Sequence, residues 1–400
     1  MKRLATAVLL ATLLGLSCAE PFDPQSLVKS LRVLGIRAEP PEARPGTPMA
    51  LEALVVDSVR SRPPSILWVG CDADPFGQGR SACTDTAVLN DPGQLSSSDG
   101  GLPAGVKLIG FGNRALYATP KDLFSVLPEG DVRRVEGTVG VVLALAVGED
   151  VPLSATPEEL RAVFDRVRAK ETAAVFALFR VRISENLLPN KNPSLSRLLR
   201  SGIPLPLGGT LQALPGASLD LEVTAPDDAF ETYVQRLPNS AEETPEKLIG
   251  AWYSSMGELK LERVALRSDV VQTFTASDGG TKFPIPENRE GSLWVVVRDT
   301  RGGQTWMQTP TYVCDETLPA PTIASVESPT KVSTTLTLRG QNLESVLEVA
   351  IGDRALTRGG FVASRQTWEA PLTGLDAGTY DVKVLSRGCH DVTAPTVLLQ

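Results

Sequence analysis

The sequence is a succession of short apolar runs separated by turns that are rich in proline and glycine. One turn and its run, RPGTPMALEALVVD at residues 44–57, is matched by LPGASLDLEVTAPD at residues 214–227. In both copies a Pro-Gly pair precedes apolar residues at alternate positions, which is the period of a strand with one buried face. A repeated pattern of this kind predicts two domains of one type.

Each copy continues in the same way. A tryptophan-bearing run follows, around Trp68 and Trp252, and then a long apolar run at residues 138–148 and 292–303. We expect Trp68 to fill the space between two sheets, although a tryptophan that acts as a ligand platform is the alternative. Four alternating side chains of the first copy are expected to face one core: Met49, Leu51, Ala53 and Val55.

Two segments of the first copy begin with Thr-Pro and acidic residues, the signal of a helix start. They are TPKDLFSVL from Thr119 and TPEELRAVFDRVRAK from Thr156, and we expect a helix in each. The second has an apolar stripe on one face, formed by Leu160, Val163, Phe164 and Val167. We expect this helix to lie across the sandwich as a connecting element, with a partner-binding helix as the alternative. The strand that follows should turn Arg180 and Arg182 outward.

The C-terminal part of the chain reads PTIASVESPTKVSTTLTLRGQNL, then VLEVAIGDRAL, then LDAGTYDVKVLSRG. This series resembles the IPT/TIG family, which implies an immunoglobulin-like fold there. Gly340 and Asn342 are expected at positive-φ turn positions, and Tyr380, Val382 and Val384 should alternate onto a core face. The series departs from the family at SPTKVS, where a Gly-rich loop is usual. The matching positions are Pro321, Ile323, Val326, Leu336, Leu338, Gly340, Asn342, Leu343, Gly352, Gly378, Thr379, Tyr380, Val382 and Val384.

The predicted fold class is therefore mainly β, with tandem β-sandwiches that resemble bacterial immunoglobulin-like domains, the first with a helical insertion. The strand rhythm and the central tryptophans carry this resemblance. The expected organisation is a signal peptide at 1–17, a tether at 18–30, sandwiches at 31–190 and 191–318, and an IPT/TIG-like sandwich at 319–400.

The N-terminus has the layout of a secretory signal. Lys2 and Arg3 precede an apolar stretch from Leu4 to Leu16, which is too short to span a membrane. The segment Leu14-Gly15-Leu16-Ser17-Cys18 resembles the bacterial lipobox, although Gly15 stands where that motif usually has leucine. The resemblance implies cleavage before Cys18, a diacylglycerol on its sulfur and an acylated, palmitate-bearing anchor. Ala19 resembles the pattern of sorting to the outer membrane.

Four further cysteines agree with an exported protein, in which disulfides form. We pair Cys71 with Cys83 across a polar, Gly-rich loop, and Cys314 with Cys389. Three pairings are formally possible, and free thiols are the alternative.

The sequence gives no sign of a catalytic or metal centre. His390 is the only histidine, and GxSxG, HExxH, P-loop and dinucleotide motifs are absent. Asp72, Asp74 and Asp85 crowd the loop between the first two cysteines; they can be a calcium site, but their spacing favours solvated carboxylates. No metal, cofactor or catalytic residue is therefore assigned.

The formal net charge of −8 argues against nucleic acid as a partner. We predict a lipid-anchored cell-envelope protein, located at the outer membrane, that acts as a non-catalytic binding or adhesion module for an envelope protein or glycan. An architectural subunit of an envelope complex is the first alternative, and a carboxylate-dependent hydrolase is the second.

Overall fold

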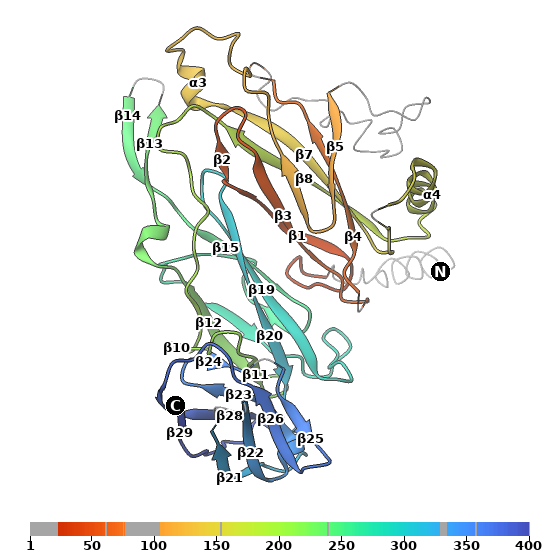
Figure 1. Ribbon diagram of the computed structural model, residues 1–400, viewed down its shortest axis with the longest axis vertical. Coiled ribbons are helices and arrows are strands. Elements are labelled where there is room, and N and C mark those ends of the chain that lie inside the picture. The colour runs from red at the N-terminus through yellow and green to blue at the C-terminus, as the bar shows by residue number, and fades with distance from the viewer. Residues whose placement is uncertain are drawn as a thin grey trace, which may run out of the picture.

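The computed structural model describes residues 23–60, 62–74, 76, 105–152, 154–237, 240–328, 334–356 and 358–399. These residues form three β-sandwiches in tandem, which confirms the predicted fold class (Figure 1). The third sandwich lies at one end of the elongated molecule and contains the C-terminal strand. Cys18 and the whole signal segment lie outside the described residues.

The first sandwich packs a three-stranded sheet on a five-stranded sheet. The three-stranded sheet has the order β1 (Arg32–Glu39), β3 (Met49–Val56), β6 (Arg114–Tyr117). The five-stranded sheet has the order β2 (Glu42–Ala43), β8 (Ala174–Ile183), β7 (Thr138–Val147), β4 (Ser65–Cys71), β5 (Val106–Phe111). As predicted, Met49, Leu51, Ala53 and Val55 belong to one core. The Trp68 ring is fully buried there, and its Nε1 donates to the Gly112 carbonyl at 2.7 Å, so this tryptophan is a core residue.

The helical insertion is present between β7 and β8. Helix α4 (Pro157–Arg168) places Val163 against Leu145 and Val147 of β7, with Phe164 and Val167 packed beside them. The helix therefore covers the outer face of the five-stranded sheet, as the apolar stripe predicted. Strand β7 is buried along nearly its whole length because both its faces are covered.

Helix α4 begins at a capping box. The Thr156 Oγ1 accepts from the Glu159 backbone N–H at 3.3 Å, and the Glu159 carboxylate accepts from the Thr156 N–H at 2.7 Å. Replacing Thr156 with Ala should lower the free energy of unfolding by about 1 kcal/mol, because the Glu159 backbone N–H loses its side-chain acceptor. Urea unfolding of the first sandwich measures this, and Thr156→Ser, which keeps the hydroxyl, should be close to wild type. An alanine variant as stable as the serine variant would contradict the prediction.

The other predicted helix, from Thr119, is wrong. Residues 121–126 form successive turns, with i to i+3 hydrogen bonds from Ser125 to Asp122 and from Leu127 to Phe124. Pro128 and Gly130 follow so soon that too few residues remain to nucleate a helix. Thr119 does not cap these turns; its hydroxyl accepts from the Gly46 N–H instead. A short helix, α3 (Val132–Glu136), comes later and is capped by Asp131.

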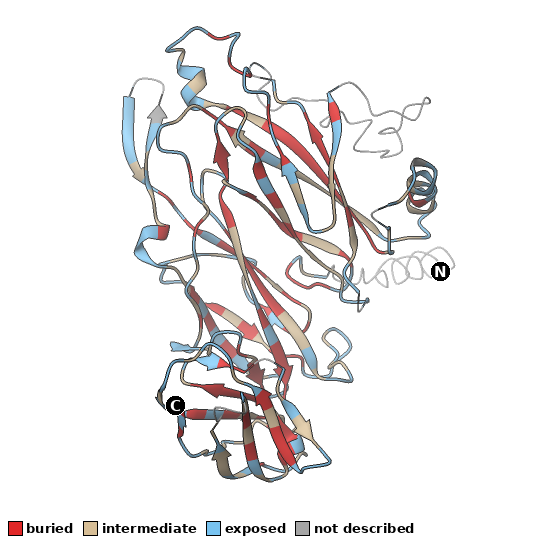
Figure 2. Ribbon diagram, viewed as in Figure 1, coloured by how far each residue is buried: buried red, intermediate tan, exposed pale blue. Residues whose placement is uncertain are grey.

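The second sandwich has two five-stranded sheets and a projecting hairpin. One sheet has the order β10 (Ile203–Pro204), β9 (Arg197–Arg200), β12 (Ser218–Thr224), β18 (Gln272–Thr275), β16 (Glu258–Leu259). The other has the order β11 (Leu211–Ala213), β20 (Gln304–Val313), β19 (Glu290–Arg298), β15 (Ile249–Ser254), β17 (Arg263–Ala265). The 3-10 turn η3 (Asp227–Ala229) leads into the exposed hairpin of β13 (Thr232–Leu237) and β14 (Ser240–Pro245) (Figure 2).

The topology of these two sandwiches confirms the internal repeat. In each sandwich a short strand pairs in parallel with the last strand of that sandwich. Strand β2 pairs with β8 in the first, and β11 pairs with β20 in the second. The next strand in the sheet is the long apolar strand, β7 in the first sandwich and β19 in the second. The tryptophan-bearing strand, β4 or β15, lies beside it. Gly46 and Gly216, in the two Pro-Gly turns, both have positive φ, at 80° and 70°.

The third sandwich is the smallest. Its strands form the sheets β21 (Thr322–Glu327), β22 (Thr335–Gln341), β26 (Thr367–Pro371), β25 (Gly360–Val362); β24 (Arg354–Ala355), β23 (Val346–Ile351), β28 (Val382–Ser386); and β27 (Gly378–Tyr380), β29 (Val397–Leu399). A 3-10 turn, η4 (Leu343–Ser345), precedes β23. Tyr380, Val382 and Val384 pack into its core, as expected.

The two predicted positive-φ positions of this sandwich differ in outcome. Asn342 has φ 55°, as predicted. Gly340 lies within β22 at ordinary φ, so that prediction is wrong. A Cβ at Gly340 would collide with the Thr322 carbonyl, because the backbones approach closely beside an irregularity in β21. Of the SPTKVS segment, residues 329–333 lie outside the described residues.

Candidate functional site

Apolar side chains join the first and second sandwiches. Val28 and Leu34 of the first pack on Trp294 and Val296 of the second. The two sandwiches approach closely at Gly35. A Cβ atom added there would lie 3.0 Å from Gln304 Nε2 and 3.2 Å from Val296 Cγ1, so the approach favours glycine. The Arg37 guanidinium stacks over the Trp306 ring at 4.5 Å.

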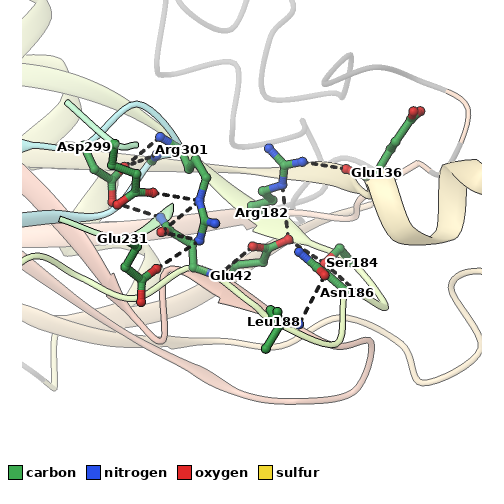
Figure 3. Close-up of polar contacts among 12 residues, drawn as sticks. Glu42, Glu136, Arg182, Ser184, Asn186, Leu188, Glu231, Asp299 and Arg301 are labelled. Carbon is green, nitrogen blue, oxygen red and sulfur yellow. Dashed lines mark hydrogen bonds and ion pairs between the residues drawn. The ribbon is translucent and has the colours of Figure 1, made fainter. Parts of the chain in front are cut away.

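A buried polar network crosses the same junction (Figure 3). Glu42, of which 3% is exposed, accepts from Ser184 Oγ at 2.6 Å and from the Asn190 N–H at 2.8 Å. The Asn190 side chain then donates to Asp299 at 3.0 Å and accepts from Arg301 Nη2 at 2.6 Å. The segment that links the two sandwiches is thus fastened to both.

Arg301 is the central cation of this network. Its Nε lies 2.8 Å from Glu246 Oε1, and its Nη2 lies 3.2 Å from Glu231 Oε2. Burial raises the pKa of Glu246 to about 7, and the nearby Asp299 adds to the rise while Arg301 opposes it. Burial also raises the pKa of Asp299, against hydrogen bonds from Asn190 and from the N–H groups of residues 301–303. Every charged side chain here has a protein partner. We therefore interpret the network as structural, with the role of stabilising the junction between the two sandwiches.

The second and third sandwiches are joined covalently and by polar contacts. Cys314 and Cys389 form a disulfide, with their Cα atoms 5.6 Å apart. Gln212 Nε2 donates to the Ser386 carbonyl at 2.7 Å, and the Thr210 N–H donates to Glu348 at 2.9 Å. These contacts fix the third sandwich against the short strand β11.

A groove of about 650 Å³ lies beside this junction. One wall consists of residues 381–385, along β28, and of residues 389–394. The opposite wall belongs to the second sandwich and comprises Arg200, Gln212, Ala213, Leu214, Ala217 and Leu219. Gln212 and Cys389 both line the groove, and the hydrogen bond from Gln212 to Ser386 joins its two walls. The volume falls within the range of ligand-binding sites, about 300–1,000 Å³.

The groove includes the Pro-Gly turn of the sequence repeat. Leu214 and Ala217, on either side of that turn, line the groove. In the first sandwich, the equivalent turn is covered: a Cβ at Gly46 would collide with Lys121 Cγ, and the Gly46 N–H donates to Thr119. The turn at 119–127 therefore occludes in the first sandwich the position that stays open in the second.

Charged side chains of both signs line the groove. Lys383 and Arg200 are exposed, as are Asp381 and Asp391. His390 Nε2 lies 2.8 Å from the Leu318 carbonyl, so its ring contacts the segment between the two sandwiches. With several polar groups and open strand backbone on its walls, the groove is the candidate binding site.

The predicted cysteine pairs differ in how far the structure tests them. The Cys314–Cys389 disulfide agrees with the prediction. Cys71 is buried at the end of β4, but Cys83 lies outside the described residues, so that pairing stays a prediction. The lipidation of Cys18 likewise stays a prediction.

The other candidate residues of the sequence do not assemble. Asp72 pairs with Lys107 at 2.6 Å, and Asp74 accepts from the Phe76 N–H, while Asp85 lies outside the described residues. Within the described ranges no group of three metal-ligating side chains is found. Among the same residues no helix is long and apolar enough to cross a membrane. The apolar face of α4 is occupied by the sheet beneath it.

Sequence reasoning missed both the groove and the network. Asp299 and Arg301 occur in the turn segment RDTRGG, which looks like an ordinary surface turn. Glu42 and Glu246 are isolated carboxylates in an acidic chain. The only sequence signal near the groove was the second Pro-Gly turn. This pattern predicts where the turn lies in the fold, but it does not predict that the turn is left uncovered.

No protein-family model matches this chain, and no curated protein is significantly similar to it. Solved structures that resemble it include SGBP-B of a Bacteroides ovatus mixed-linkage glucan utilisation locus, with 10% identity, a TM-score of 0.17, and coverage of 96% of this chain and 69% of that one. SGBP-B of a Bacteroides uniformis xyloglucan locus has 16% identity, a TM-score of 0.17, and coverage of 52% and 49%. The Ig1-2 module of the Drosophila receptor tyrosine phosphatase DLAR has 12% identity, a TM-score of 0.21, and coverage of 72% and 100%. TM-scores this low carry no conclusion about function.

Proposed function

We propose that this protein is a non-catalytic binding module of the cell envelope, anchored through a lipid on Cys18 at the outer membrane. The groove between the second and third sandwiches is the observation that supports it. Two walls from different domains enclose about 650 Å³, and a disulfide beside the groove links the two domains covalently. A site at a domain junction is a common place for ligand binding. An envelope protein or a glycan is the proposed partner.

An architectural role is the second candidate. The buried network around Arg301 and the Cys314–Cys389 disulfide fix all three sandwiches relative to one another, which a rigid spacer requires. In this role the protein holds other components at the membrane, and the groove stays empty.

Cross-linking in cells separates the two roles. A photo-reactive amino acid at Lys383, in the groove, should give one defined adduct, whereas the same group at the exposed Lys260, outside it, should not. The adduct is identified by mass spectrometry. No adduct from Lys383, together with a stoichiometric membrane complex that survives blocking of the groove, would favour the architectural role.

The anchor is tested separately. Wild-type protein should incorporate an alkyne fatty acid and partition with membranes, whereas Cys18→Ser should do neither, because the thioether attachment needs the cysteine sulfur. Several acyl chains make membrane binding stable, so the loss in the variant should be nearly complete. Equal labelling of both proteins would contradict the lipid anchor without affecting the proposal for the groove.

A further inference from the structure

Strand β28 presents its edge, and not one of its faces, to the groove. It is the last strand of its sheet, with β23 on its other side. All five consecutive residues 381–385 line the groove. Because successive side chains of a strand point to opposite faces, an unbroken run of lining residues requires the strand edge to face the cavity.

The register shows which backbone groups face the groove. The Asp381 carbonyl accepts from the Gly352 N–H at 2.9 Å, and the Arg387 N–H donates to the Ser345 carbonyl at 2.7 Å. The odd-numbered residues of this stretch therefore bond toward β23, and Val382, Val384 and Ser386 point their N–H and C=O groups the other way.

The carbonyl of Ser386 already has partners on that side. It accepts from Gln212 Nε2 at 2.7 Å and from the Cys389 N–H at 3.0 Å. For Val382 and Val384, no hydrogen bond on the groove side is present within the described part of the chain. Two donors and two acceptors are therefore available, at the alternate spacing that a neighbouring strand would match.

The path of the C-terminal segment explains why this edge is open. Strand β29 pairs with β27, so that Thr379 lies opposite Leu398. Residues 391–396, which precede β29, form no strand, and no strand pairing joins them to β28, although part of this segment lines the same groove. The second sandwich stands on the other side of the groove, so it shields this edge from open sheet-to-sheet association.

From this geometry we propose that the groove binds an extended polypeptide segment, which adds to β28 as a further strand. This rests on the proposed binding function and names its ligand class. Lys383 lies between the two free backbone positions, its side chain is exposed, and no ion pair of the described residues includes it. Arg200, on the facing wall, has none either. An acidic residue directly opposite Lys383, flanked by apolar residues opposite the buried Val382 and Val384, complements this position. Because two exposed aspartates also line the groove, the outer residues of the segment should be uncharged.

A synthetic peptide tests the proposal. The probe is the acetylated and amidated sequence Thr-Thr-Val-Glu-Val-Thr-Thr, whose symmetry serves either strand direction. The full chain should bind it saturably in calorimetry, and amides of residues 382–386 should exchange more slowly when it is bound. N-methylation of its two valines and its glutamate should weaken binding at least about tenfold, because in either strand direction the N–H groups that bond to β28 are lost. Equal affinity for the methylated peptide, or no binding of either, would overturn the inference.

Protein variants give an independent readout. Val384→Pro removes an N–H that faces the groove and should abolish binding, while Val384→Ala, which keeps it, should bind the peptide. Lys383→Glu should reverse the preference between peptides with central glutamate and central lysine by about threefold each way. If the Val384→Pro variant fails to fold, the comparison of the methylated and unmethylated peptides on the wild-type protein still tests the inference. A glycan adduct from the Lys383 cross-link would overturn this inference and leave the proposed binding function standing.

Discussion

Replacing Arg301 with Met should lower the free energy of unfolding by about 3–5 kcal/mol at pH 8. The Arg301 side chain is 12% exposed and contacts Glu246, which is 1% exposed, and Glu231. Without the guanidinium, buried carboxylates face one another, with Lys191 as the nearest remaining cation, 3.5 Å from Glu231. Removing one partner of a buried ion pair costs more than the pair itself contributes, because the remaining charge stays desolvated. Chemical unfolding of the first two sandwiches measures the loss.

The same network gives a stability that falls as the pH rises. Burial raises the pKa of Glu246 to about 7 in the folded protein, from its ordinary value of 4.5. Between these values the folded state binds more protons than the unfolded state, so stability decreases from about pH 4.5 to about pH 7. Asp299, whose pKa is also raised, contributes in the same direction. In wild type this change should amount to roughly 3 kcal/mol for Glu246.

Glu246→Gln is the matched variant for both expectations. It keeps the shape of the side chain but removes the titration, so its stability should vary less with pH than that of wild type over this range. Combined with Arg301→Met, it should recover part of the lost stability, because one unpaired carboxylate is gone. An Arg301→Met variant that is as stable at pH 8 as wild type, with no recovery in the double variant, would show that the network is solvated and carries little energy.

Much of the fold was predictable because local chemistry determines it. The alternation from Met49 to Val55 places one face in the core, and Thr156 with Glu159 defines the start of α4. The Pro-Gly repeat correctly predicted two sandwiches of one topology. In each case residues near in sequence supply the stabilising contacts.

The wrong and the missing predictions concern contacts between residues that are distant in sequence. Thr119 carries the same start signal as Thr156, yet its hydroxyl bonds to Gly46, which is distant in sequence. Gly340 is required by the approach of Thr322 on another strand. The groove depends on residues 391–396, which form no strand beside β28, and on how the second sandwich faces them. Such contacts between remote segments leave no local pattern in the sequence.

Removal of the Cys314–Cys389 disulfide should destabilise the third sandwich by about 4 kcal/mol, because the bond closes a loop across a sequence separation of 75 residues. The Cys314→Ala/Cys389→Ala double variant should therefore show a separate, earlier unfolding transition and proteolysis near residues 315–320. The first two sandwiches should unfold as in wild type, since their contacts are unchanged. Asp353→Asn is the control at the same junction: its carboxylate is 71% exposed and pairs with Arg197, so the change should stay within about 1 kcal/mol.

The same double variant also links the junction to the groove. Cys389 lines the groove, and Gln212 bonds to Ser386 beside it, so loosening this end should let the two walls separate. Cross-linking from Lys383 should then fall, because a ligand held between the walls loses one of them. If the double variant unfolds in a single transition at the wild-type midpoint, the noncovalent contacts of Gln212 and Thr210 alone hold the third sandwich in place, and the disulfide is dispensable for the geometry of the groove.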